Sequence, residues 1–315
     1  MAVRIALFAA VVALGIAAPF LGLYPVLLMK LLCFALFACA FNLLIGFVGL
    51  LSFGHAMFFG SAAYATGHAM KVWGFAPELG ILFGIVVAAL LGLVVGALAI
   101  RRQGIYFAMI TMALAQMVYF IALQAPFTGG EDGLQSIPRG VLFGVLPLQN
   151  DLTLYFVVLA CVVAAWLFIA RIVHSPFGQI LKAIRENEPR TISLGYDTDR
   201  FKLIAFVLSA ALAGLAGSLK AIVLGFATLS DVFWATSGSV ILMSLIGGIG
   251  TLTGPVIGAF VITGLENVLA DRVGSWVTVV LGVIFVVTVL LFRQGLVGTL
   301  KRYFPGAGAR RVEPA

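Results

Sequence analysis

The chain has 315 residues, of which 63% are hydrophobic and only 10% are charged, and its mean hydropathy is +1.17. Soluble domains carry about 25% charged residues, so this composition excludes a soluble protein and indicates an integral membrane protein. The apolar runs are long and rich in Gly, Ala, Val and Leu, which excludes a β-barrel and predicts an all-α, polytopic bundle of transmembrane helices. The net charge of +7 is explained by basic residues held on one side of the membrane, so no nucleic-acid partner is expected.

Apolar runs of spanning length follow one another through the first two thirds of the chain. The first, at 5–24, has one basic residue before it and an Ala-rich end, features shared with cleavable signal peptides, but its length favours a span. A glycine-rich loop precedes residue 152 and contains Glu131 and Asp132. The further predicted spans are 26–46, 48–70, 79–100, 105–124, 152–170 and 203–222.

The C-terminal third is interrupted. Residues 237–250 and 254–270 are short and broken by several glycines and Pro255, and a last span is predicted at 276–292. Irregular backbone is tolerated in a membrane only where protein or a protein-lined cavity surrounds it. We therefore expect broken helices beside a transport path. The total is ten spans if both broken segments cross the membrane, and eight if together they form one re-entrant excursion.

The distribution of basic residues predicts the orientation. If the N-terminus lies inside, fourteen basic residues lie inside, four lie outside, and Lys30 lies within a span. The inside set is Arg4, Arg101, Arg102, Arg171, Lys182, Arg185, Arg190, Arg200, Lys202, Arg293, Lys301, Arg302, Arg310 and Arg311, and the outside set is Lys71, Arg139, Lys220 and Arg272. This asymmetry predicts that both termini, including a tail at 293–315, are cytoplasmic and that the loop at 129–151 faces out.

Residues 175–202 form the longest strongly polar segment, and such a segment must lie in water between two spans. Within it, residues 177–184 place apolar side chains at helical spacing. Pro189 can open a second short helix, and Gly195 can close it in a left-handed cap. Two short helices on the cytoplasmic side predict a docking surface for a soluble partner. The alternative is an amphipathic loop that rests on the lipid headgroups.

Several kinds of chemistry are not expected. The chain has no G-x-x-x-x-G-K-[ST] motif, and GGIGTLTG at 247–254 lacks the strand and the acidic residue of a nucleotide-binding fingerprint. Cys33, Cys39 and Cys161 lie in apolar runs, so no disulfide, zinc site or other metal site is predicted. Ser52 and His55 would share a helix face, but no acidic residue accompanies them, so no catalytic residue is assigned.

Ion coupling is disfavoured as well. Proton- and sodium-driven carriers usually keep an Asp or Glu in the middle of a span, and the best candidate here is Glu266, which we interpret as an interfacial or capping acid. A transporter without such a carboxylate and without its own ATP site needs an external motor.

Polar residues inside the predicted spans are the candidates for a translocation path. Small residues among them also fit simple helix packing. The candidates are Asn42, Ser52, His55, Thr111, Gln116, Ser244, Gly248 and Thr251.

Four stretches resemble a known family. They are FNLLIGFVGLLSFGHAMFFGSAAYATG at 41–67, TGGEDGL at 128–134, the segment from SPFGQILKAIRENEP to AGLAGSL at 175–219, and GGIGTLTGPVIGA at 247–259. The sequence resembles the permease subunits of branched-chain amino-acid ABC importers, specifically the M-type subunit. It departs from the family in RENEPRTISLG, where members are typically rich in Ala and Glu.

The resemblance implies a single permease domain, 1–315, in the bacterial inner membrane. It implies a heterodimer with a homologous second permease, two ATPase subunits that bind ATP and Mg, and a periplasmic binding protein; this chain itself holds no cofactor. Relatives also carry urea, short amides or other amino acids, and an ion-coupled secondary carrier is the alternative of another class. The resemblance further implies that the ATPase is contacted by Glu188, Pro189, Ile192, Ser193, Leu194 and Gly195.

Overall fold

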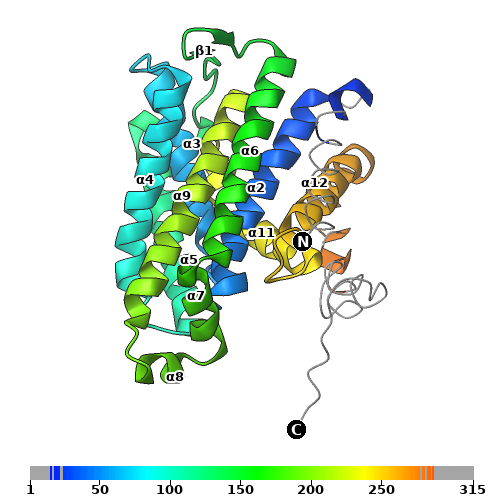
Figure 1. Ribbon diagram of the computed structural model, residues 1–315. Helices are drawn as coiled ribbons and strands as arrows, with labels where there is room; N and C mark the ends of the chain where they lie inside the picture. Colours follow the sequence, from blue (N-terminus) through cyan, green and yellow to red (C-terminus); the bar gives the residue numbers. More distant parts are fainter. Residues whose placement is uncertain are drawn as a thin grey trace.

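The computed structural model describes residues 24–276 without a gap, together with Gly15, 18–21, 279–280, 282–284 and Val286. The predicted spans at 5–24 and 276–292 lie largely outside the described residues, and the tail at 293–315 lies wholly outside them. The structure is an all-α bundle (Figure 1). Its described strands are a two-residue antiparallel pair, β1 (Val141–Leu142) and β2 (Leu146–Pro147).

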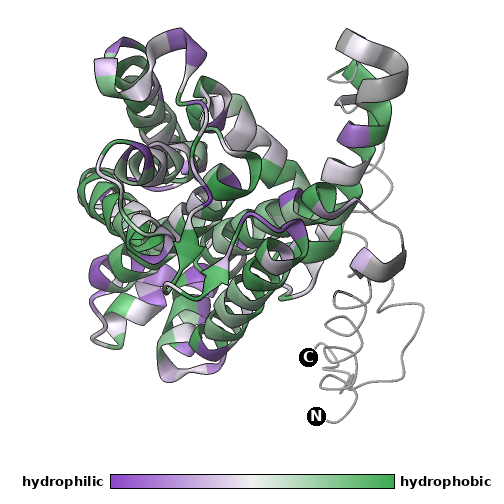
Figure 2. Cartoon of the chain, turned by 90° about the horizontal axis from the view of Figure 1, so that it is seen from above, coloured by the Kyte–Doolittle hydropathy of each residue, from purple (hydrophilic) through white to green (hydrophobic). Residues whose placement is uncertain are grey.

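Five of the described helices are long and apolar enough to cross a membrane, so the chain is a multi-pass membrane protein. They are α2 (Pro25–Phe47), α4 (Pro77–Ala99), α5 (Ile105–Gln124), α6 (Asp151–His174) and α9 (Thr198–Leu224). Four short 3-10 helices also occur, η1 (Ala18–Leu21), η2 (Pro126–Thr128), η3 (Gly130–Asp132) and η4 (Gly274–Trp276). Viewed along the bundle, the helices are mainly hydrophobic (Figure 2).

Helices α2 and α9 form the centre of the bundle. In the most apolar 18-residue stretch of each helix, 83% is buried in α2 and 72% in α9, against 28% in α4, 28% in α5 and 33% in α6. The three outer helices therefore present most of their apolar side chains to the surroundings of this chain. Lipid or another membrane subunit can cover such a surface, whereas water cannot stabilise it.

Glycine allows α9 to approach α3 (His55–Lys71) closely. A Cβ atom added at Gly217 of α9 would collide with the backbone carbonyl of Phe59 in α3. On the neighbouring α4, a Cβ at Gly84 would collide with the hydroxyls of Ser218 and Thr66, which are hydrogen-bonded to each other at 2.8 Å. Small residues thus bring three helix backbones together, the packing expected between membrane helices.

The third predicted span is shorter than expected. A helix was predicted from residue 48, but α3 begins at His55, and residues 48–54 are not helical. Gly49 has a φ of +85°, a conformation that ends the preceding helix, and glycine disfavours helix continuation. With 17 residues α3 is about 25 Å long, less than the ~30 Å hydrocarbon core of a bilayer. The prediction that Ser52 and His55 share a helix face is therefore wrong.

The loop at 125–150 and the polar segment at 175–197 lie at opposite ends of the bundle, joined by α6 (Figure 1). The loop is fixed to the C-terminal end of α9, because Leu134 pairs with Ala227 and the Ile137 N–H donates to the Gly225 carbonyl at 2.8 Å. The Arg139 guanidinium adds an ion pair with Asp151 at 2.6 Å. We call this end the loop end and the opposite one the α8 end.

The interrupted segments each connect the two ends. After α9, the chain passes through α10 (Leu229–Val232) and α11 (Trp234–Gly247) from the loop end to Gly250, which lies beside Gly46 near the end of α2. Helix α12 (Gly254–Val273) then returns packed against α2. Within the described residues, the chain therefore leaves the loop end through α10 and α11, turns at Gly250 and returns through α12. Helix α10 was not predicted.

The tight contact between α3 and α9 gives a stability test. We expect Gly217→Ala to lower the free energy of unfolding by about 1–3 kcal/mol, because the added methyl group has no space. The matched control is Gly238→Ala in α11, where an added Cβ meets nothing within 4 Å. Thermal melting of the protein in detergent measures both, and equal melting temperatures would contradict the close approach.

Candidate functional site

The polar segment folds as two short helices, as predicted. The first, α7 (Pro176–Glu186), begins at Ser175, whose hydroxyl accepts a hydrogen bond from the Gly178 N–H at 3.3 Å. It buries the apolar side chains of Leu181 and Ile184 against the bundle. Because its apolar face is already covered by the protein, α7 is a docked part of the fold and not a helix lying on lipid.

The second short helix, α8 (Glu188–Ser193), has signals at both ends. The Asn187 side chain accepts a hydrogen bond from the Arg190 N–H at 3.0 Å, and Pro189 occupies the first turn. Gly195, with a φ of +89°, donates to the Ile192 carbonyl at 2.8 Å, and the Tyr196 N–H points to the Thr191 carbonyl at 3.4 Å. These two bonds form a Schellman motif. The predicted start at Pro189 and cap at Gly195 are confirmed.

The outer side of α8 exposes apolar side chains at a place that must lie in water. Ile192 is 54% exposed, Leu194 is 69% exposed and Tyr196 is 43% exposed. Pro189, Ser193 and Gly195 are exposed beside them. Clusters of exposed apolar side chains on a polar surface are typical of protein–protein contacts.

Glu188 differs from the other predicted coupling residues, because its carboxylate faces the bundle. It forms an ion pair with Lys202 of α9 and accepts hydrogen bonds from the Thr198 hydroxyl at 3.1 Å and from Gln103, in the turn between α4 and α5, at 2.9 Å. Lys202 is only 1% exposed. Breaking a buried ion pair on one side leaves an uncompensated charge, so α8 is firmly tied to α9 and to the α4–α5 turn.

The structure contradicts the sequence-based prediction for Lys202. It was counted among basic residues in water, and the span was predicted to begin at 203, but α9 begins at Thr198 and encloses it. Helical periodicity could not reveal its partner, since Glu188 lies 14 residues away on a different helix.

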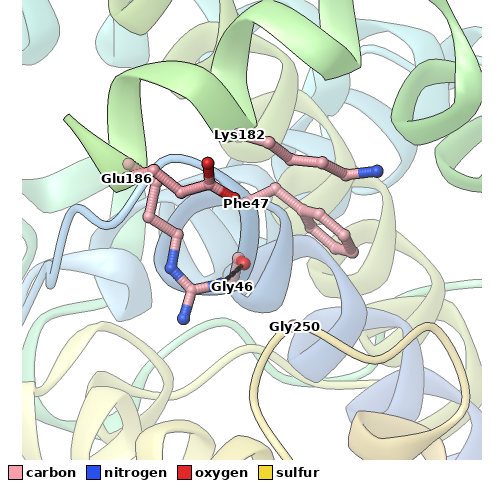
Figure 3. Close-up of a pocket in the computed structure, with 6 residues that line it drawn as sticks. Gly46, Phe47, Lys182, Glu186 and Gly250 are labelled. Atoms are coloured by element: carbon pink, nitrogen blue, oxygen red, sulfur yellow. Dashed lines mark hydrogen bonds between the residues drawn. The ribbon is translucent and has the colours of Figure 1, made fainter. Parts of the chain in front are cut away.

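Arg185 of α7 contacts the end of α2. Its guanidinium donates a hydrogen bond to the Gly46 carbonyl and lies beside Gly250, in the loop between α11 and α12. Lys182 lies over the Phe47 ring, 6.0 Å from its centre. Figure 3 shows the pocket at this junction; it has a volume of about 430 Å³ and is lined by Gly46, Phe47, Lys182, Arg185, Glu186 and Gly250.

Asn42 of α2 holds the loop at 248–253. Its side-chain NH₂ donates to the Thr251 carbonyl at 2.8 Å, and its oxygen accepts from the Gly250 N–H at 2.9 Å. The Thr251 hydroxyl in turn donates to the Gly248 carbonyl at 2.8 Å. Of the predicted path residues, the structure therefore brings Asn42, Gly248 and Thr251 together. The contacts run without a break from α8, through α7 and the end of α2, to this loop.

The other predicted path residues lie apart from this junction. His55 is buried; its Nε2 contacts the Ser209 hydroxyl at 2.8 Å, and its ring meets Phe41 edge to face. The remaining contacts are local or structural. The Ser52 hydroxyl accepts from the Gly54 N–H at 3.3 Å, the Thr111 hydroxyl donates to Ala108 in its own helix at 2.9 Å, the Ser244 hydroxyl donates to the Ala38 carbonyl at 3.4 Å, and Gln116 is half-buried on α5.

Asp231 is a carboxylate that the sequence analysis missed. No buried acid was expected within the spans, but Asp231 of α10 is 6% exposed and forms an ion pair with Lys220 of α9 at 2.6 Å. Lys220 had been counted among the basic residues on the outer side of the membrane. The available signal was the spacing of Thr228 and Asp231, which is that of a capping box and marks the start of a helix.

Among the described residues, no group of three or more His, Cys, Asp or Glu side chains lies close enough to hold a metal ion. Cys33, Cys39 and Cys161 are free thiols.

A polytopic helical bundle with interrupted helices beside a central helix, and with exposed apolar side chains on a short helix at one end, has the architecture of a transport permease. Residues 23–289 match the family model of the permease component of the branched-chain amino acid transport system, and the chain belongs to this family. The resemblance stated from the sequence is thereby confirmed.

Two named groups of relatives are similar to the chain. The high-affinity branched-chain amino acid transport system permease proteins LivM of Escherichia coli K12 and Salmonella typhimurium are each 28% identical over 283 residues, or 81% of this chain and 65% of the relative. The autoinducer 2 import system permease protein LsrC of Yersinia pseudotuberculosis is 28% identical over 211 residues, or 62% of this chain and 58% of the relative. The chain thus spans 65% of the length of the LivM relatives. No solved structure gives a significant match.

The two hydrogen bonds between Asn42 and the loop at 248–253 can be tested directly. Asn42→Leu keeps the side-chain size but leaves the Gly250 N–H and the Thr251 carbonyl without partners, at a cost of about 1–3 kcal/mol each. We expect amide hydrogen exchange at 248–252 to accelerate about tenfold or more. Thr111→Val, which removes a hydroxyl bonded only within its own helix, should leave the exchange of this loop unchanged. Slow exchange in Asn42→Leu would show that other contacts hold the loop.

Proposed function

We propose that the chain is the permease subunit of an ABC importer for branched-chain amino acids, in the bacterial inner membrane. It would receive its substrate from a periplasmic binding protein and release it into the cytoplasm, while separate subunits bind and hydrolyse ATP with Mg. The observation that carries this proposal is the family match over residues 23–289. The relatives named for branched-chain amino acid transport support the substrate.

In this proposal the α8 end is cytoplasmic, as the distribution of basic residues predicts. An ATPase subunit would cover the exposed side of α8, around Ile192, Leu194 and Gly195. A homologous second permease would complete the path, and a second ATPase subunit would bind to it. The binding protein would dock at the loop end, where the loop at 125–150 is braced by Arg139.

The contacts at the α8 end support a route by which ATP hydrolysis could act on the path. A force on α8 reaches α9 and the α4–α5 turn through Glu188. It also reaches the loop at 248–253 through Arg185 and the end of α2. Packed elements move as units and do not deform continuously, so displacement of α8 would shift the interrupted helices α11 and α12 together.

A different solute is the second candidate, because the LsrC relatives are named for autoinducer 2 and are as similar in identity as the LivM relatives. Urea, short amides and other amino acids belong to the same alternative. An ion-coupled carrier is the alternative of another class.

Uptake of radiolabelled leucine tests the proposal. The vesicles contain this chain, its partner permease, the ATPase subunits and the binding protein, with ATP supplied or withheld inside. We expect uptake that requires ATP and the binding protein and that ionophores do not abolish. Uptake that collapses with ionophores would refute the ATP-driven mechanism. No leucine uptake by an assembled complex with intact ATPase activity would refute the substrate, and the solutes above would then be tried.

The role of α8 can be tested at its cap. Gly195→Val forces a β-branched residue into a left-handed conformation, at a cost of about 1–2 kcal/mol. We expect ATP hydrolysis to lose its response to the loaded binding protein and leucine uptake to fall severalfold, whereas Gly195→Asn, which tolerates this conformation, should retain most activity. Gly74→Val is the matched control, since Gly74 has a φ of +67° and open space around it at the loop end. Normal coupling in Gly195→Val would remove α8 from the mechanism.

A further inference from the structure

An ion pair lies inside the bundle where the chain breaks between α9 and α11. The Lys220 Nζ is 2.6 Å from the Asp231 Oδ2, and the two side chains are only 5% and 9% exposed. The same Asp231 oxygen accepts from the Thr228 N–H at 3.0 Å and from the Thr228 hydroxyl at 3.2 Å. The Lys220 ammonium group also lies 4.7 Å from the centre of the Phe226 ring.

The fold alone does not require both charges. Asp231 caps α10 through Thr228, and an uncharged acceptor could do the same. Lys220 adds a second buried charge, although replacing a buried ion pair by apolar residues is often neutral or stabilising. Ionisable residues inside membrane proteins are costly, and they mark the routes of substrates and ions.

A polar group without a partner lies beside this pair. Tyr64 of α3 is 5% exposed, and its buried hydroxyl has no hydrogen-bond partner among the described residues. Gly60, four residues earlier on the same face of α3, packs against the backbone of Asp231 and Val232, so Tyr64 faces the same region. Buried polar groups are normally hydrogen-bonded, so the Tyr64 hydroxyl can still form a hydrogen bond with a bound molecule.

The segment that carries Asp231 has exposed residues on both sides of it. Ala227 pairs with Leu134 in the loop at 125–150. Ser230 and Trp234, on either side of Asp231, are exposed. The backbone at Asp231 and Val232 packs against Gly60 of α3, where a larger residue would not fit. Asp231 therefore lies in an interrupted segment near the loop end, and interrupted helices are where transport proteins place their substrate sites.

We propose that Lys220, Asp231 and Tyr64 bind the charged ends of a zwitterionic amino acid on its way through the importer. This inference rests on the proposed function. The substrate ammonium group pairs with the Asp231 carboxylate, the substrate carboxylate pairs with the Lys220 ammonium group, and the Tyr64 hydroxyl gains a partner. One ion pair is exchanged for two, so no buried charge is left alone at any stage. A neutral solute cannot make this exchange.

The test uses the complete importer in vesicles and the double variant Lys220→Met with Asp231→Asn. This variant leaves no lone charge, and the Asn oxygen can still cap α10. We expect leucine uptake to fall at least tenfold, while ATP hydrolysis still responds to the loaded binding protein. The matched control makes the same kind of change at the other buried pair of α9, Lys202→Met with Glu188→Gln. There, the response of hydrolysis to the binding protein should be lost together with uptake.

Each outcome of this test either supports or refutes the proposed site. Unchanged leucine uptake in the Lys220 and Asp231 variant would show that the pair has only a structural role and would refute the site. Loss of uptake together with loss of stimulated ATP hydrolysis would also refute the site. Uptake is measured first with the unmodified importer. Failure with leucine at that step refutes the proposed substrate, and the zwitterion site is refuted as well if the importer takes up only solutes that lack an ammonium and a carboxylate group. If the double variant does not assemble, Tyr64→Phe decides, because it removes only a hydroxyl that has no partner. It should lower uptake at least threefold, and full activity would overturn the proposal.

Discussion

The fold depends on satisfying backbone groups wherever a helix is interrupted inside the bundle. The interior offers little water, so each interruption needs partners within the protein. Asn42 supplies them for the loop at 248–253, and Thr228 with Asp231 supplies them for the start of α10. The late start of α3 is held by Ser237, whose hydroxyl accepts from the Ala56 N–H at 2.8 Å. These few side chains fix where the irregular backbone lies, and the irregular backbone in turn lies beside the central helices.

Helix α9 links the two ends of the molecule electrostatically. It carries one buried lysine near each end, Lys202 opposite Glu188 of α8 and Lys220 opposite Asp231 of α10. Each pair ties this central helix to a short helix, one with exposed apolar side chains at the α8 end and one in the interrupted segment. In a low-dielectric interior such pairs are strong but costly when broken on one side.

The two proposed roles of this chain are physically distinct. The α8 end offers an exposed apolar surface, including Leu194, on a short helix anchored from behind by Glu188. The loop end offers buried opposite charges and a Tyr64 hydroxyl that has no hydrogen-bond partner among the described residues. A surface of the first kind suits a soluble protein that pushes, and a site of the second kind suits a small charged molecule. Between them run α9 and α11.

The sequence by itself determined the membrane class, most helix bounds and the two short helices of the polar segment, because hydropathy, Pro189 and Gly195 act locally. It also identified the family, through the four stretches that resemble it. Only the tertiary structure decided the late start of α3, the grip of Asn42 on the loop at 248–253, and the burial of Lys202 and Lys220. Charge counting places a lysine in water unless its partner is known, and the partners here lie on other helices. Pairing between distant segments depends on how helices pack, and no local pattern records it.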